Sequence, residues 1–178
     1  MVRAACAQLC VLLVACAGGT AAPDFTLRDD GGSPWTLSQQ HGKAVVLTFG
    51  FTHCADTCPA TLAKLARVTG STARAKTDAE IVFITIDPAR DGVVALHRFV
   101  ERFALPDGAP IVGLTGSPAQ IRNVERQYHI WSQPMPKGEI AHTAAIYLID
   151  PQGRIRAVRD DSDSVRSLSR AIGAMLPS

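Results

Sequence analysis

Two cysteines separated by three residues are the side chains of this sequence best suited to chemistry. Cys54 and Cys58 lie in the segment FGFTHCADTCP, and Pro59 follows the second one directly. Two sulfurs at this spacing can converge on one point, either as a disulfide or as ligands of one metal ion. Thiolates are soft ligands that favour Cu(I), zinc or iron–sulfur clusters, whereas Cu(II) usually also needs nitrogen.

A plain structural disulfide is the alternative interpretation of this pair. A disulfide that closes so small a loop removes little entropy from the unfolded chain and therefore adds little stability. This favours a chemical role for the pair. We expect Pro59 to open a helix, because proline is favoured at the first helical position. Cys58 would then lie at a helix N-terminus, where the backbone amides and the dipole lower the pKa of a thiol.

The elements that must position these cysteines alternate between strand and helix patterns. Nearly continuous apolar runs at 43–51 and 80–87 predict strands that are buried on both faces. The other expected elements are a hairpin of 25–27 with 35–37 around Asp30–Ser33, strands at 111–115, 144–150 and 155–158, and helices at 59–74, 94–103, 119–128 and 164–175.

This order predicts an α/β protein with a thioredoxin-like fold. Its mixed central sheet is flanked by helices and preceded by the N-terminal β-hairpin. In that arrangement the loop that leaves the first buried strand and enters the long helix is the usual reactive position, and it contains Cys54 and Cys58. The loop before residue 144 lies next to it, which predicts that His142 is close to the cysteines and supplies the nitrogen.

Other side chains are weaker candidates as ligands. His142 could itself be a solvated loop histidine, and His53 is tethered too closely to Cys54 to turn toward the same ion. We expect structural or surface roles for the remaining four, which are His41, His97, His129 and Met135.

The first residues differ from the rest of the chain and predict export. Arg3 precedes a small, apolar stretch at 4–17 that is interrupted only by Gln8, as in a secretory signal. Leu13-Val14-Ala15-Cys16 resembles the bacterial lipobox, in which the cysteine is lipidated after cleavage. Ordinary cleavage a few residues later, leaving a soluble periplasmic protein, is the alternative. The expected division is a lipoprotein signal peptide at 1–15, a tether at 16–23 and the folded domain at 24–178.

Composition excludes several classes of function. The chain has 178 residues and a formal net charge of +2, and its scattered basic residues give no case for nucleic-acid binding. It has no run of apolar residues typical of a membrane-spanning helix. Cys6 and Cys10 leave with the leader and Cys16 carries the lipid, so Cys54 and Cys58 cannot form a four-cysteine zinc site.

The segment from Gly50 to Pro59 resembles the signature of the Sco/SenC family, copper chaperones of cytochrome c oxidase assembly. The similarity extends to three further segments, which are 85–91, 114–118 and 142–153. It implies one copper ion, Cu(I) or Cu(II), on Cys54, Cys58 and His142. It also implies delivery of copper to the binuclear copper centre of an oxidase subunit, or reduction of that subunit's cysteines beforehand.

The leader predicts the location, and the resemblance implies the partners. We expect a protein on the periplasmic side of the bacterial cell envelope, attached through Cys16. Its partners would be the copper-centre subunit of cytochrome c oxidase and other copper chaperones or thiol–disulfide reductants. One position departs from the family, because Ala141 stands where an aspartate usually precedes the copper-binding histidine. This leaves the ligands intact and bears on Cu(II) affinity and on docking.

Two other functions compete with copper delivery. A thiol–disulfide oxidoreductase without stable copper would use the same cysteines, although the thioredoxin-type motif has two residues between them instead of three. A peroxiredoxin-like peroxidase needs one activated thiolate, and no matching proline and threonine precede Cys54. The c-type haem motif is absent.

The lipobox-like run generates the first testable prediction. We expect the native protein to partition with membranes, and Cys16→Ala to be released or misprocessed, because the lipid is attached to that sulfur. Membrane fractionation with mass spectrometry of the N-terminus measures both. A wild-type protein that is freely soluble, or one whose mature N-terminus carries no lipid on Cys16, would contradict the assignment.

Overall fold

The computed structural model describes residues 19–176, and its centre is a pair of parallel strands. These strands are β4 (Ala44–Gly50) and β5 (Ala79–Thr85), and all seven residues of each are buried. Strands buried on both faces read as continuous apolar runs, as both of these do. They place the end of β4, from which the cysteine loop departs, in the middle of the sheet.

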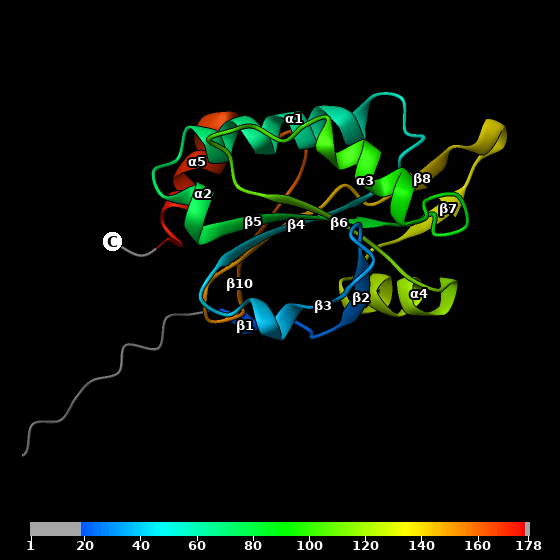
Figure 1. Cartoon of the computed structure of the whole chain (residues 1–178), viewed down its shortest axis with the longest axis horizontal. Coiled ribbons are helices and arrows are strands. Elements are labelled where there is room, and N and C mark those ends of the chain that lie inside the picture. The colour runs from blue at the N-terminus through cyan, green and yellow to red at the C-terminus, as the bar shows by residue number, and fades with distance from the viewer. Residues whose placement is uncertain (1–18, 177–178) are drawn as a thin grey trace, which may run out of the picture.

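An eight-stranded mixed sheet forms around this pair (Figure 1). Its order is β1-β10-β9-β4-β5-β6-β2-β3, with β4, β5 and β6 parallel and every other pairing antiparallel. The remaining strands are β1 (Thr20–Ala21), β2 (Thr26–Asp29), β3 (Pro34–Thr36), β6 (Ile111–Thr115), β9 (Ile146–Ile149) and β10 (Arg154–Arg159). The expected N-terminal hairpin, β2–β3, joins the sheet edge beside β6.

Helices cover both faces of the sheet (Figure 1). One face carries α1 (Thr57–Gly70), α2 (Ala75–Asp78), α3 (Val93–Glu101) and α5 (Val165–Gly173), and the other carries α4 (Pro118–Gln127) and the short 3-10 helix η1 (Leu37–Gln40). The Ser117 hydroxyl accepts a hydrogen bond from the backbone N–H of Gln120, and the Gln120 side chain accepts one from the backbone N–H of Ser117. This capping box fixes the start of α4 where the sequence predicts it.

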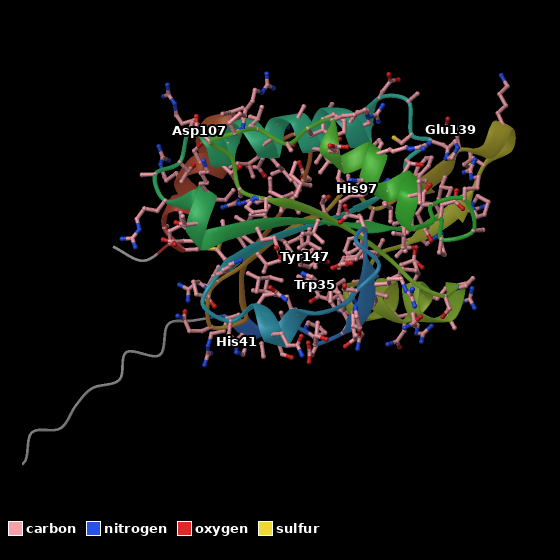
Figure 2. All side chains as sticks on the ribbon, in the orientation of Figure 1. Trp35, His41, His97, Asp107, Glu139 and Tyr147 are labelled. Carbon is pink, nitrogen blue, oxygen red and sulfur yellow. The ribbon has the colours of Figure 1, made fainter. Side chains whose placement is uncertain are left out.

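Aromatic side chains fill the space between the sheet and the layer of α4. Trp35 and Tyr147 both point into it (Figure 2), and the Tyr147 and Tyr128 rings meet edge to face with centroids 5.0 Å apart. The Trp35 indole donates to the buried carboxylate of Glu80 over 3.2 Å. Burial raises the pKa of Glu80, and this hydrogen bond opposes the rise.

The thioredoxin-like fold class is confirmed, with differences at several boundaries. Helix α1 begins at Thr57, two residues before the proline expected to open it, so Cys58 lies inside its first turn. Thr20–Ala21, expected in the tether, instead form β1 against β10. One further hairpin was not predicted. In it β7 (Ser132–Pro134) pairs with β8 (Ile140–His142), and the 3-10 helix η2 (Pro136–Gly138) lies between them.

The predicted leader and Cys16 lie outside the described residues, so the expected lipid anchor stays a prediction. Over residues 19–176, none of the helices is both long enough and apolar enough to cross a bilayer.

Candidate metal centre

Cys54 and Cys58 lie on either side of the junction between a loop and a helix. Cys54 is half-buried in the β4–α1 loop, and Cys58 is the second residue of α1. The backbone N–H of Cys58 donates to Cys54 Sγ over 3.3 Å, so an unpaired amide at the start of the helix points at that sulfur. Both cysteines are free thiols in this structure.

Cys58 is packed against the sheet and is only 4% exposed. Gly50 makes this possible, because a Cβ at that position would lie 2.8 Å from Cys58 Sγ and 2.7 Å from the Phe83 ring. Burial is the main cause that raises the pKa of the Cys58 thiol, and the contact with Cys54 raises it further. The prediction of a lowered pKa is therefore wrong, because burial outweighs the hydrogen bond with the Phe51 backbone, which lowers the pKa.

His142 ends strand β8 and is oriented by its own neighbour. Its Nδ1 lies 3.0 Å from the carbonyl oxygen of Thr143. A carbonyl can only accept, so Nδ1 carries the proton and Nε2 keeps the lone pair that a metal would use. The imidazole also meets the Phe51 ring edge to face, with centroids 6.3 Å apart.

The structure brings His142 to Cys58, as the sequence predicts. Both side chains line one small cavity between the end of β4, the start of α1 and the residues before β9. Cys54 lines an adjacent hollow with His53 and Pro59. Among residues 19–176, no three His, Cys, Asp or Glu side chains are close enough together to hold a metal ion.

These donors fit a soft metal ion by their chemistry. Copper accepts two sulfurs and an imidazole nitrogen as ligands, and the Nε2 atom of His142 is available because the proton of the ring is on Nδ1. A three-ligand site would need Cys54, Cys58 and His142 to come closer together than they are in this structure. The ligand set in this conformation is therefore partly assembled.

A buried carboxylate holds the cysteine loop in place. Asp91 is fully buried, and its two oxygens accept hydrogen bonds from Thr52 N (2.8 Å), Thr52 Oγ1 (2.6 Å) and Thr85 Oγ1 (2.8 Å). Its backbone carbonyl accepts from Thr115 Oγ1 over 2.9 Å. Asp91 thereby joins the ends of β4, β5 and β6. Its contact in the cysteine loop, Thr52, lies two residues before Cys54. Sequence reasoning missed this role, although Asp91 ends the segment 85–91 that carries the family resemblance.

Arg90 attaches the hairpin that contains His142 to the body of the domain. Its guanidinium donates to the Gly138 carbonyl over 2.6 Å and also pairs with Asp87. Gly138 has φ +80, and a Cβ there would meet the guanidinium at 2.8 Å. The signal that could have indicated this hairpin is the turn-forming run from Pro134 to Gly138.

The weaker candidates lie apart from the Cys58–His142 cavity. His53 has a 55% exposed side chain and hydrogen-bonds through Nδ1 to Thr52 Oγ1. His97 pairs with Asp30 on the surface, and this hydrogen bond raises the pKa of His97. His41, His129 and Met135 do not line the cavity either.

Comparison with known proteins settles the family. The SCO1/SenC family model matches residues 17–176. The chain belongs to the SCO1/SenC family. Among curated Sco proteins, the mitochondrial SCO2 homolog of Mus musculus is 36% identical over 169 residues, covering 86% of this chain and 64% of that protein. The chain thus spans somewhat less than two thirds of that relative's length.

Solved Sco structures share this fold. The crystal structure of Arabidopsis thaliana ScoI with copper bound is 32% identical with a TM-score of 0.79, covering 88% of this chain and 98% of that one. The structure of Bradyrhizobium japonicum ScoI with copper bound is 28% identical with a TM-score of 0.76, covering 88% of this chain and 100% of that one.

The Asp91 contacts generate a prediction for this Sco domain. Asp91→Ala removes the acceptor of three hydrogen bonds and leaves buried donors without partners, which costs about 3 kcal/mol or more. We expect a lower unfolding midpoint in urea. We also expect faster alkylation of Cys54 by iodoacetamide under native conditions, because its loop loses this attachment.

Asp107→Ala is the matched control, since that side chain is 89% exposed. A surface substitution of this kind costs within about 0.5 kcal/mol. Equal unfolding midpoints and alkylation rates for the two variants would contradict the role of Asp91.

Proposed function

We propose that this Sco domain is a copper-binding assembly factor that serves the binuclear copper centre of cytochrome c oxidase. Copper is its cargo, held by Cys54, Cys58 and His142. The observation that supports this most directly is the cavity that Cys58 and His142 share, with the imidazole Nε2 left free. Solved relatives that contain copper support it independently.

The surroundings of each ligand suit a metal that is held and then released. Thr143 fixes the proton of His142 on Nδ1, as outer-shell partners of metal-binding histidines usually do. Cys58 is buried and relinquishes its proton with difficulty, so metal binding must displace a proton from it. Cys54 is the more accessible sulfur and the natural point at which a partner's thiolate meets the metal.

Position 141 tunes this site further. Ala141 gives the imidazole no neighbouring carboxylate within β8, although Asp161 lines the same cavity from the loop before α5. The negative charge at the site therefore comes from the cysteine sulfurs and from the carboxylate of Asp161.

A thiol–disulfide oxidoreductase is the second candidate, and the unequal burial of the two sulfurs favours it. In such a reaction the Cys54 thiolate attacks a partner disulfide, forms a mixed disulfide and releases one partner thiolate. Cys58 then attacks Cys54 Sγ and releases the second, so the partner gains two electrons and the domain becomes oxidised. Stoichiometric copper that remains on the reduced domain after desalting would separate the first function from this one.

We place the protein at the periplasmic side of the bacterial envelope, tethered to the membrane through a lipid on Cys16. The support is the apolar N-terminal stretch ending in Leu13-Val14-Ala15-Cys16. Residues 1–15 would then be the signal peptide, and the folded domain would begin a few residues after the anchor, close to its partner in the membrane.

The histidine assignment gives the sharpest test of copper binding. His142→Ala removes the nitrogen, which Cu(II) requires more than Cu(I) does, because Cu(I) tolerates two thiolates alone. We expect at least about a tenfold loss of Cu(II) affinity and a shifted or absent thiolate-to-copper absorption band, with Cu(I) stoichiometry largely kept. Titration of the reduced domain, followed by absorption and electron spin resonance, measures this.

His53→Ala is the matched control, because His53 adjoins Cys54 but does not line the cavity of Cys58 and His142. It should leave both copper states nearly intact. If His53→Ala abolishes Cu(II) binding while His142→Ala leaves the spectrum unchanged, the wrong histidine has been assigned.

A further inference from the structure

A groove leads away from Cys54 along helix α1. One hollow is lined by Cys54, Pro59, Arg102 and Phe103, among others. A second hollow shares Arg102 and Phe103 and continues beside α1 as far as Leu105. Because the two hollows share these side chains, they form one groove between α1 and the C-terminal end of α3, with the Cys54 sulfur at one end.

The groove is positively charged. Arg67 and Arg102 both line it, and no acidic side chain lines either hollow. Over residues 19–176, neither arginine makes an ion pair with a carboxylate. Two guanidinium groups without counter-charges attract carboxylates to this surface.

Arg102 is also held in a defined position. Its guanidinium carbon lies 4.8 Å from the centre of the Phe99 ring and 5.5 Å from that of Phe103. Cation–π contacts of this kind restrain the side chain, so less entropy is lost when it binds a ligand. Leu105, 43% exposed, provides an apolar contact at the far end.

We propose that this groove binds an acidic segment of the partner protein and guides that segment's cysteine to Cys54. The proposal rests on the proposed function, because it describes how the partner thiol reaches the copper or the disulfide. The arginines would pair with carboxylates that flank the partner cysteine, while Phe103 and Leu105 cover an apolar side chain.

Two other occupants fit the groove less well. A second copy of this chain would bring the same arginines against each other around a two-fold axis, because an isologous contact pairs like surfaces. An anionic lipid headgroup would pair with the arginines but offers no group for the sulfur at the end of the groove.

The test uses short synthetic peptides with a single cysteine activated as its 2-thiopyridyl disulfide. One peptide carries several glutamates beside the cysteine, and a second carries glutamines in their place. The Cys54 thiolate attacks the peptide sulfur, forms a mixed disulfide and releases pyridine-2-thione. Cys58 then displaces the peptide thiol, so the protein pair is oxidised by two electrons as the activated disulfide is reduced.

We expect the reduced wild-type protein to react about fivefold faster with the glutamate peptide than with the glutamine peptide at low salt. The preference should fade as salt screens the charges. Each rate is divided by that with dithiodipyridine, a small neutral disulfide, which removes any effect on the intrinsic reactivity of Cys54. The double variant Arg67→Gln/Arg102→Gln should lose the preference and still bind copper like the wild type.

The matched control is Arg98→Gln/Arg122→Gln, which removes the same charge from exposed positions outside the groove. Equal rates for the two peptides with the wild type, or equal loss of preference in both double variants, would overturn the proposal. The wild type could also show no peptide preference but self-associate or bind phosphatidylglycerol vesicles. If only the Arg67/Arg102 variant loses that association, the groove belongs to a second copy or to lipid instead. Copper binding by the reduced wild-type protein is measured separately. If that protein binds no copper, the proposed function fails, whatever the result with the peptides.

Discussion

The buried carboxylate of Asp91 is the interaction on which the arrangement of the site depends. It lies where the parallel strands β4, β5 and β6 end, and it accepts hydrogen bonds from the segments that follow β4 and end β5. A buried carboxylate is costly unless its oxygens are satisfied, and here each one has a hydroxyl or an amide donor. The cysteine loop therefore leaves the sheet in one direction only, with Cys54 two residues beyond the last of these contacts.

That fixed departure makes the two cysteines unequal. Cys58 turns back against Gly50 and Phe83 and is desolvated, whereas Cys54 stays half-buried at the head of a charged groove. Cys58 thus lines the same cavity as His142, and Cys54 lines a hollow at the surface. This division suits both binding a metal ion and passing it on, and it equally suits thiol–disulfide exchange.

Much of the framework could be predicted from sequence because its signals are local. The apolar runs of β4 and β5, the helical pattern of α4 and the turn between β2 and β3 each depend on neighbours in the chain. The pKa of Cys58 could not be predicted in this way, because Phe83 and Gly50 reach it from strands that only the folded sheet brings together. The same holds for Asp91, which meets Thr52 across 39 residues.

The hairpin β7–β8 was missed for a different reason. Its strands are three residues each and none of their residues is buried, so they show neither an apolar alternation of useful length nor a buried run. Proximity of His142 to Cys58 could nevertheless be predicted, because it follows from the position of the residue just before β9. The hydrogen bond that orients the imidazole could not.

The most direct test of three protein ligands on one ion is X-ray absorption at the copper edge of the reduced domain loaded with Cu(II). We expect two sulfur scatterers and one imidazole nitrogen from the protein in the first coordination shell. A shell made only of nitrogen and oxygen, or one with a single sulfur, would contradict a site built from Cys54, Cys58 and His142.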